Sequence, residues 1–316
     1  MDDKNNFLIE NFLNYLSTVR GKSPNTINAY RYDLTIFFKF LAMKKFNIAN
    51  TSFDDIDISN IDDNFIKKIT LMDLYSFISY VTNERKNNLR ARARKVACIR
   101  SFFNFLHKKL KIIENNPALE LETPKLDIRQ PIYLSLEESR ALLKAVSGEF
   151  KERDYAILML FLNCGLRLSE LVNINIDNIK EDKLTVIGKG NKQRTIYLNN
   201  ACIKAVNEYL KVRPTEGVVD PEALFLSKRK KRISIKTVQY LVKKYIMLAN
   251  LKNKKYSTHK LRHTAATLMY KYGNVDIRTL QKILGHSSVS TTQIYTHVDD
   301  EQLREAMKSN PLAEEI

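Results

Sequence analysis

The chain has 316 residues, and its hydrophobic content of 44% is enough to form buried cores in two domains. No run of 18 apolar residues occurs, and the N-terminus, MDDKNNFLIE, lacks the basic and apolar regions of a signal peptide, which argues against membrane and secreted proteins. The three cysteines, Cys98, Cys164 and Cys202, are widely spaced in apolar contexts, so neither a disulfide framework nor a cysteine-based zinc site is expected. We expect a cytoplasmic protein.

The charge points to a polyanionic partner. The chain carries 52 basic and 35 acidic residues, a formal net charge of +17. Residues 1–130 hold 21 basic and 15 acidic residues (+6), and residues 131–316 hold 31 and 20 (+11), so both halves are basic. Other basic proteins share such a balance, but nucleic acid is the leading partner, and both halves are expected to touch it.

The first 110 residues have the pattern of four helices. Ser23-Pro24 supplies an N-cap and a first-turn proline for a long amphipathic helix, and Thr70 with Asp73 forms a capping-box pattern for another. A further helical period runs from about Asn88 to Leu110. Between the second and third helices, residues 46–66 contain five aspartates and no basic residue. We expect a solvated, partly irregular insertion there that avoids any phosphate backbone.

The fourth helix is strongly basic. Residues 85–111 contain ten lysines and arginines and no acidic residue. One interpretation is a solvated basic face, and the other is a helix lying on DNA. In the second interpretation the candidate DNA contacts are Arg90, Arg92, Arg94, Lys95 and Arg100.

The pattern changes after this helix. Residues 113–130 contain two prolines and lose the helical period, which predicts a linker between an N-terminal domain (1–112) and a second domain (131–316). Ser135 with Glu138 forms a capping box that opens the second domain, and residues 184–188 and 194–198 alternate like the strands of a hairpin. A basic cluster, Lys228, Arg229 and Lys230, follows as a second candidate DNA contact.

Four of the five histidines fall within 39 residues near the C-terminal end of the sequence, namely His259, His263, His286 and His297. His259, Arg262 and His263 lie within about one turn of a predicted helix, and His286 follows a glycine that ends the next one. Tyr295 comes nine residues later. Upstream, Arg167 follows the helix-ending Gly165, so its side chain projects from a fixed backbone.

This set of residues suits attack on a phosphodiester. Planar guanidinium groups can clamp two non-bridging oxygens, the role we expect for Arg167 and Arg262. Tyrosine is a poor nucleophile at its free pKa of about 10, so Tyr295 needs a cationic site or a nearby base to attack and would form a phosphotyrosine. The leaving 5′ oxygen needs a proton, which Lys189 at the hairpin tip or His259 could deliver.

Single residues also allow plainer interpretations. Arg167 could simply pair with Glu170 on the surface, and His286 could merely follow a helix end. His259 and His263 could bind zinc, but the metalloprotease motif needs Glu where Lys260 stands. Lys192 lies close to Lys189 as a rival for the same role, whereas His263 is expected to support packing or the site rather than to react.

The ordered motifs resemble those of the tyrosine site-specific recombinases, the phage integrase family, and among them the Xer-type members most. The resemblance covers nearly the whole chain and rests on four motifs: Gly165-Leu-Arg-Leu-Ser-Glu-Leu171, Gly188-Lys-Gly-Asn-Lys-Gln-Arg194, His259-Lys-Leu-Arg-His263, and Leu284-Gly-His286 followed by eight residues and Tyr295. Lys189 matches the Gly-Lys-Gly pattern. The acidic insertion departs from the shortest Xer-type chains.

The resemblance implies a mainly α fold, with an N-terminal four-helix, SAM-like DNA-clamping domain and a mixed α/β, mostly helical catalytic domain that contains a small antiparallel sheet. It implies catalytic roles for Arg167, Lys189, His259, Arg262, His286 and Tyr295, supporting roles for Glu170 and His263, and no metal or other cofactor. A helix at residues 300–309, carrying Leu303 and Met307, would dock on a neighbouring protomer.

The same resemblance implies a nucleoid-associated enzyme that cuts double-stranded DNA at an inverted-repeat site. Each protomer would form a 3′-phosphotyrosine, and strand exchange would pass through a Holliday junction. The working assembly would be a homotetramer, or a heterotetramer with a second recombinase, and a DNA translocase is a candidate partner. Chromosome-dimer resolution, integration or excision of a mobile element, and inversion remain as alternative tasks.

Three other functions compete with this hypothesis. A type IB topoisomerase uses a similar set of residues but relaxes supercoils as a monomer. An architectural DNA-binding protein needs only the basic surfaces. A metal-dependent hydrolase that uses the histidines would lose its activity to chelators.

Overall fold

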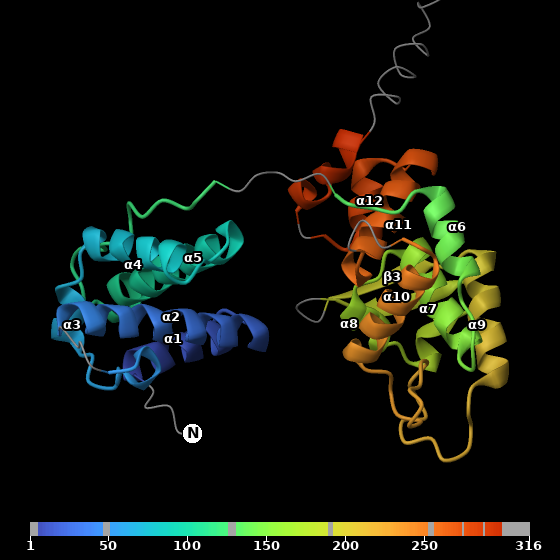
Figure 1. Cartoon of the computed structure of the whole chain (residues 1–316), viewed down its shortest axis with the longest axis horizontal. Helices are drawn as coiled ribbons and strands as arrows, with labels where there is room; N and C mark the ends of the chain where they lie inside the picture. Colours follow the sequence, from blue (N-terminus) through green and yellow to red (C-terminus); the bar gives the residue numbers. More distant parts are fainter. Residues whose placement is uncertain are drawn as a thin grey trace, which may run out of the picture. The chain divides into compact units, whose positions relative to one another are not determined.

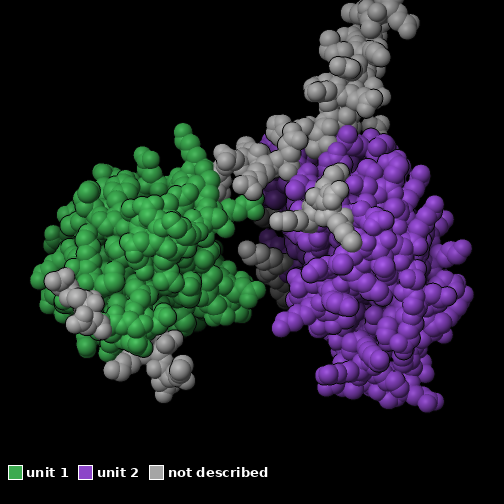
Figure 2. All heavy atoms as spheres, viewed as in Figure 1, with its two compact units in different colours: residues 1–127 green, residues 128–316 purple. Residues whose placement is uncertain are grey.

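The computed structural model describes residues 6–46, 51–125, 131–188, 192–251, 256–273, 275–286 and 288–298. The chain divides into two compact units, unit 1 (residues 1–127) and unit 2 (residues 128–316), which Figure 2 colours separately. The described part of unit 1 is helical, and unit 2 adds a small antiparallel sheet. The predicted mainly α fold is therefore confirmed. No helix in the described residues is long and apolar enough to cross a membrane.

Unit 1 is built on four long helices (Figure 1), as the sequence predicted. They are α1 (Phe7–Thr18), α2 (Pro24–Lys45), α4 (Leu71–Asn83) and α5 (Leu89–Phe105), joined by the 3₁₀ turn η1 (Phe53–Asp55), the short α3 (Asp63–Lys67) and, after α5, the π turn η2 (Leu106–Leu110). Helix α2 contacts each of the other three long helices. Polar side chains cap their N-termini: Ser23 accepts from the backbone of Thr26, and Thr70 and Asp73 form the predicted capping box.

The core of unit 1 is aromatic. Six fully buried phenylalanines from all four long helices meet in it: Phe12, Phe37, Phe38, Phe77, Phe102 and Phe103. Their rings pack edge to face, for example Phe37 on Phe77 at 5.1 Å between centroids. Such pairs add about 0.5–1.5 kcal/mol beyond the area they bury. The basic face of α5 is thus carried on a firmly packed helix.

The acidic insertion is more than a solvated segment. Ile56, Ile58 and Ile61 are 4–6% exposed, and the last two belong to the core of unit 1. The Asn6 side-chain amide donates to the carbonyls of Ile58 (3.1 Å) and Ile61 (2.7 Å), which ties the insertion to the start of α1. The expectation of a solvated insertion was wrong for these isoleucines, because they alternate with the aspartates and turn inward.

The segment predicted as a linker also contributes to unit 1. Ile113, Ala118 and Leu121 are 1–6% exposed and pack into the same core. The prolines end the helical period but do not end the unit. Residues 126–130, the rest of the predicted linker, lie outside the described residues.

The elements of unit 2 pack around one buried helix. Its helices are α6 (Leu136–Lys144), α7 (Lys151–Cys164), α8 (Leu168–Val172), α9 (Asn200–Val212), α10 (Ile235–Leu248), α11 (Thr258–Tyr272) and α12 (Ile277–Leu284), with 3₁₀ turns η3 (Ile176–Asn178), η5 (Val289–Thr291) and η6 (Gln293–Val298). Helix α7 contacts α6, α9 and α11, and every residue from Ala156 to Leu162 is buried. A helix that is apolar on all sides is expected at the centre of a domain.

The predicted hairpin is present within a three-stranded sheet. Strands β1 (Ile179–Lys180), β2 (Lys183–Ile187) and β3 (Gln193–Tyr197) are antiparallel in that order. The register pairs Leu184 with Ile196 and Val186 with Arg194. Because side chains alternate along a strand, Arg194 lies on the same inward face as Ile196. The hairpin tip, residues 189–191 including Lys189, lies outside the described residues.

Candidate active site

Two helix ends meet where the candidate catalytic arginines emerge. Gly165 ends α7 with φ +58°, and Gly285 ends α12 with φ +63°. A Cβ atom on Gly165 would stand 2.8 Å from a methyl carbon of Leu284, so a larger residue would have to displace that buried side chain. Arg167 follows as the N-cap residue of α8. Glycine is therefore needed at position 165 for both its backbone angle and the close approach.

Glu170 is the centre of the site. It is 3% exposed and accepts hydrogen bonds from the backbone N–H and the Nη1 of Arg167, both at 2.7 Å. Arg194 binds the same carboxylate with Nη1 at 2.5 Å and Nη2 at 2.9 Å, and Arg262 lies 3.8 Å away. Burial alone would raise the pKa of Glu170, but the hydrogen bonds from Arg194 and Arg167 outweigh it and lower the pKa to about 2.

The two candidate clamp arginines are also held by backbone carbonyls. Arg262, 2% exposed, donates from Nη1 to Gly165 O and from Nη2 to Leu284 O, both at 2.6 Å. Arg167 donates from Nη2 to Gly285 O at 2.8 Å. Burial and the charge of Arg167 lower the pKa of Arg262 to about 10, so it stays protonated at neutral pH. Three guanidinium groups face one carboxylate, which leaves an excess of positive charge at this point of unit 2.

The histidines border this site as neutral rings. His259 and His263 on α11 lie with ring centroids 4.6 Å apart. Burial and nearby cations lower the pKa of His259, His263 and His286, for the last two to about 4. The Nδ1 of His286 is 3.0 Å from the hydroxyl of the buried Thr292. Among the described residues, no group of three or more His, Cys, Asp or Glu is placed to hold a metal ion.

Tyr295 is buried beside these histidines. It is 1% exposed in η6 and packs against Ala266, Leu280 and Leu284. Its hydroxyl lies 2.7 Å from the Nδ1 of His263. Burial raises the pKa of Tyr295 to about 12, and the charge of Arg262 opposes that rise. His263 was expected only to support packing or the site, but the structure places it in direct contact with the candidate nucleophilic oxygen.

The structure brings most of the predicted site residues together and adds one that sequence reasoning missed. Arg167 and Arg262 reach both Glu170 and the end of α12, His286 directly follows that end, and His259 adjoins His263. The tip residue Lys189, the side chain of His297 and the predicted helix at 300–309 lie outside the description. The missed residue is Arg194, and its signal was a charged side chain at an inward strand position, two residues before the buried Ile196.

The basic residues of α5 differ in how free they are. Arg90 and Arg100 are exposed, Arg92 Nη1 donates to the Thr82 hydroxyl at 3.3 Å, and Arg94 pairs with Asp33 and with Ala29 O. Lys95 is 2% exposed, and its ammonium binds Asp33 Oδ1 at 2.5 Å. The prediction of Lys95 as a DNA contact was wrong, because this buried lysine neutralises Asp33 and has no path to a phosphate.

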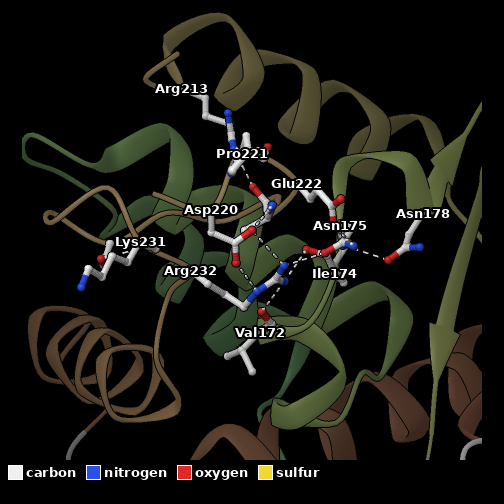
Figure 3. Close-up of polar contacts among 12 residues, drawn as sticks. Val172, Ile174, Asn175, Asn178, Arg213, Asp220, Pro221, Glu222, Lys231 and Arg232 are labelled. Carbon is white, nitrogen blue, oxygen red and sulfur yellow. Dashed lines mark hydrogen bonds and ion pairs between the residues drawn. The ribbon is translucent and has the colours of Figure 1, made fainter. Parts of the chain in front are cut away.

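The second basic cluster stands on an anchored loop. Lys228, Arg229 and Lys230 are exposed in a turn that Ser227 closes, with Lys230 N donating to Ser227 O at 2.9 Å. At the base of the loop, Arg232 binds Asp220 at 2.9 Å, Asn175 Oδ1 at 2.7 Å and the carbonyls of Val172 and Ile174 (Figure 3). These bonds fix the loop to the segment that follows α8.

Comparison with known proteins decides the family. Residues 133–302 match the phage integrase family, and residues 9–109 match the phage integrase N-terminal SAM-like domain. The chain belongs to the phage integrase family. Tyrosine recombinase XerC of Caldanaerobacter subterraneus subsp. tengcongensis is 68% identical over 98% of this chain and 88% of its own length. Tyrosine recombinase XerD of Proteus mirabilis is 34% identical over 96% of this chain and 92% of its own length.

Solved structures of phage integrase family members share the fold. XerH bound to a palindromic difH substrate in a post-cleavage complex has a TM-score of 0.72, 22% identity, and coverage of 95% of this chain and 84% of that one. The XerA recombinase has a TM-score of 0.51 and 30% identity, covering 95% and 96%. The predicted enzyme class, a Xer-type tyrosine recombinase that cuts and rejoins DNA at specific sites, is confirmed.

Proposed function

We propose that the cluster around Glu170 is the phosphodiester-transfer site. Arg167 and Arg262 bind the non-bridging oxygens of the scissile phosphate, and Tyr295 is the nucleophile. The observation that carries this proposal is the excess of guanidinium charge: three arginines converge on one buried carboxylate, and each arginine is also held by a backbone carbonyl. Cations that are fixed before the substrate arrives stabilise developing negative charge most effectively.

The proposed reaction is a transesterification. The Tyr295 Oη–phosphorus bond forms while the bond from phosphorus to the 5′ oxygen breaks, and the phosphoryl group becomes a 3′-phosphotyrosine. The phenolic proton passes to a neutral imidazole, and the leaving oxygen takes a proton from Lys189 or His259. His286, hydrogen-bonded to Thr292, lies beside the clamp arginines. Attack by the 5′ hydroxyl of a partner duplex then reverses the chemistry and gives a Holliday junction.

We propose that DNA is held by both units, with unit 1 as the clamping domain and unit 2 as the catalytic domain. In unit 2 the contacts are Lys228, Arg229 and Lys230. In unit 1 they are the exposed Arg90 and Arg100, with smaller contributions from Arg92 and Arg94, whose guanidinium groups already have protein partners.

The assembly proposed is a tetramer on an inverted-repeat site. Crystal structures of the relatives show XerH on difH DNA and a tetramer of lambda integrase on a Holliday junction. We propose that residues 300–309 link neighbouring protomers, that a DNA translocase is a partner, and that the enzyme works at the nucleoid. Chromosome-dimer resolution is the task favoured by the Xer-type relatives.

The test is covalent trapping on nicked suicide duplexes that carry candidate inverted repeats, with EDTA present. Wild type is expected to form a protein–DNA adduct, and Tyr295→Phe is expected to bind the same DNA without forming one. Tyr272→Phe is the matched control, because this tyrosine is 69% exposed on α11 and is expected to form the adduct normally. Adduct formation by Tyr295→Phe would overturn the assignment. Joining of the trapped strand to a second duplex separates recombination from topoisomerase activity.

A further inference from the structure

Arg194 makes three hydrogen bonds at the site, although none of the roles proposed above uses it. Its Nη1 and Nη2 form a fork on the two oxygens of Glu170 at 2.5 and 2.9 Å, and its Nε donates to Ile283 O at 3.1 Å. The side chain is 13% exposed. A largely covered planar fork that makes all these bonds is fixed in position, so Arg194 is part of the structure that holds the site.

Each of the three arginines donates to a different carbonyl at the end of α12. Ile283 O accepts from Arg194, Leu284 O from Arg262, and Gly285 O from Arg167. The last carbonyls of a helix have no partner within the helix and carry the negative end of its dipole, so each guanidinium group satisfies one of them. His286 directly follows this end. A shift of Arg194 would therefore change the positions of both clamp arginines and of His286.

Gly285 leaves room for the Arg194 guanidinium, and Gly188 lies beside it. A Cβ atom on Gly285 would lie 3.0 Å from Arg194 Cδ and 3.2 Å from its Nη1. A Cβ atom on Gly188, at the end of β2, would lie 3.6 Å from Nη1 and 3.4 Å from Glu170 Oε1. The end of α12 therefore approaches the guanidinium more closely than most side chains would allow, whereas the distances at Gly188 are ordinary van der Waals contacts. Through Arg194, the strand that follows the hairpin tip is tied to the arginine cluster.

We propose that Arg194 is a positioning residue for DNA cleavage: it occupies Glu170 with its fork and holds the end of α12, which leaves Arg167 and Arg262 in place and charged for the phosphate. The inference rests on the proposed function. Without Arg194, one carboxylate and two arginines remain, and Arg262 Nη1, already 3.8 Å from Glu170 Oε2, would turn from Gly165 O to the acid. The clamp would then be neutralised and misplaced.

The first experiment compares Arg194→Met and Arg194→Lys with wild type in the full-length protein. DNA affinity and the single-turnover rate of adduct formation at saturating suicide DNA are measured separately. We expect Arg194→Met to bind DNA within about threefold of wild type and to form adduct at least about 100-fold more slowly, in line with loss of a charge-stabilising group. Arg194→Lys keeps the charge but loses the fork, so we expect partial recovery. An unchanged rate in Arg194→Met overturns the proposal.

The double variant Arg194→Met/Glu170→Gln tests the charge balance. If Arg194 acts by occupying Glu170, neutralising that acid should release Arg167 and Arg262, and we expect at least about tenfold recovery over Arg194→Met. A role in stability alone would make the double variant worse than either single one. A double variant that is no faster than Arg194→Met would refute the charge-balancing role.

Arg153→Met is the matched control. Arg153 also forms a fork on an acid, from Nε and Nη2 to Asp154 at 2.9 and 2.8 Å, and donates to a carbonyl, Leu226 O, at 2.9 Å. It is similarly buried, but it lies about 18 Å along α7 from Gly165, at 1.5 Å per residue. We expect Arg153→Met to lower the melting temperature without slowing cleavage at saturating DNA. If Arg153→Met slowed cleavage as much as Arg194→Met does, Arg194 would contribute only to stability.

Hydrogen exchange separates this inference from the proposed function. In Arg194→Met, but not in Arg153→Met, the amides of Gly285 and His286 are expected to exchange faster, because Ile283 O has lost its donor and the end of α12 is loosened. This measurement needs no cleavage activity. A wild type that forms no Tyr295-dependent adduct would refute the proposed function, whereas unchanged exchange at 285–286 in Arg194→Met would refute the positioning role.

Discussion

Asp33 in unit 1 and Glu170 in unit 2 are both buried carboxylates that bind cationic side chains, but the two sites serve different purposes. Asp33 is 1% exposed and binds Lys95 and Arg94, both from α5. Glu170 is 3% exposed and faces three arginines, which come from the start of α8, from β3 and from α11. The first site joins two helices, and the second gathers three separate elements.

The difference lies in what else holds the cations. The buried ammonium of Lys95 binds Asp33, and it also lies over the ring of Tyr32 in a cation–π contact. The arginines around Glu170 each bind a carbonyl at the end of α12 as well. Arg94 also donates to a carbonyl, Ala29 O, but the buried Lys95 depends on the acid, whereas all three arginines around Glu170 are held by carbonyls. The second arrangement therefore leaves the larger excess of positive charge for a substrate, with three guanidinium groups against one carboxylate.

The largest effect is expected when Asp33 is neutralised. Asp33→Asn keeps the shape but leaves the Lys95 ammonium buried without a counter-charge, which costs about 3–5 kcal/mol. Hydrogen exchange on the full-length protein should show this lower stability as a loss of protection in α2 and α5, with protection in α7 and α11 unchanged. Glu170→Gln is expected to cost unit 2 less stability, because its arginines keep their carbonyl partners. Unchanged protection in α2 and α5 would contradict the view of Asp33 as a structural link.

The second effect is acid sensitivity, which should be concentrated in unit 2. The pKa of His263 and of His286 is about 4 in the folded protein, against about 6.5 when unfolded. Between those values the unfolded chain binds more protons, so stability is complete above pH 6.5 and is lost as the pH falls to 4. We expect roughly 2 kcal/mol in total, less than the shifts alone imply because both rings are partly exposed.

Urea unfolding followed by hydrogen exchange at pH 7 and pH 5 would measure this loss in each unit. His263→Gln should reduce the pH dependence of unit 2. His107→Gln, in unit 1, is the control and should leave the pH dependence of unit 2 as it is in wild type. A unit 2 that is equally stable at both pH values would contradict the neutral-histidine site.

Local signals made most of the fold predictable. Three helices start where their capping residues predicted, because a cap depends only on residues a few positions apart. The caps are Ser23-Pro24, Thr70 with Asp73, and Ser135 with Glu138. The alternating pattern likewise identified β2 and β3. Secondary structure of this kind is decided within one turn or one strand, so it can be derived without the rest of the fold.

Contacts between distant segments were not predictable in the same way. Lys95 looked like a member of a basic face, since Asp33, its partner 62 residues earlier, becomes a neighbour only when α2 packs on α5. Arg194 was passed over because its partners, Glu170 and Ile283 O, come from two other elements. The motifs pointed to Arg167, Arg262 and Tyr295, but not to the frame that holds them. The catalytic role of Lys189 stays a prediction.

The smallest effect concerns salt dependence and distinguishes free from paired cations on α5. Arg100 is exposed on the same stripe of the helix as Arg90, Ala97 and Asn104, whereas Arg94 is engaged by Asp33. If Arg100 contacts a phosphate, Arg100→Gln should reduce the slope of log K against log salt concentration by about 0.9, the value for one lost phosphate contact. Arg94→Gln removes the same charge but should change the slope less, because its guanidinium is already partly neutralised within the protein. Equal changes in slope for the two variants, measured by fluorescence anisotropy from 50 to 200 mM salt, would mean that Asp33 does not withhold Arg94 from DNA.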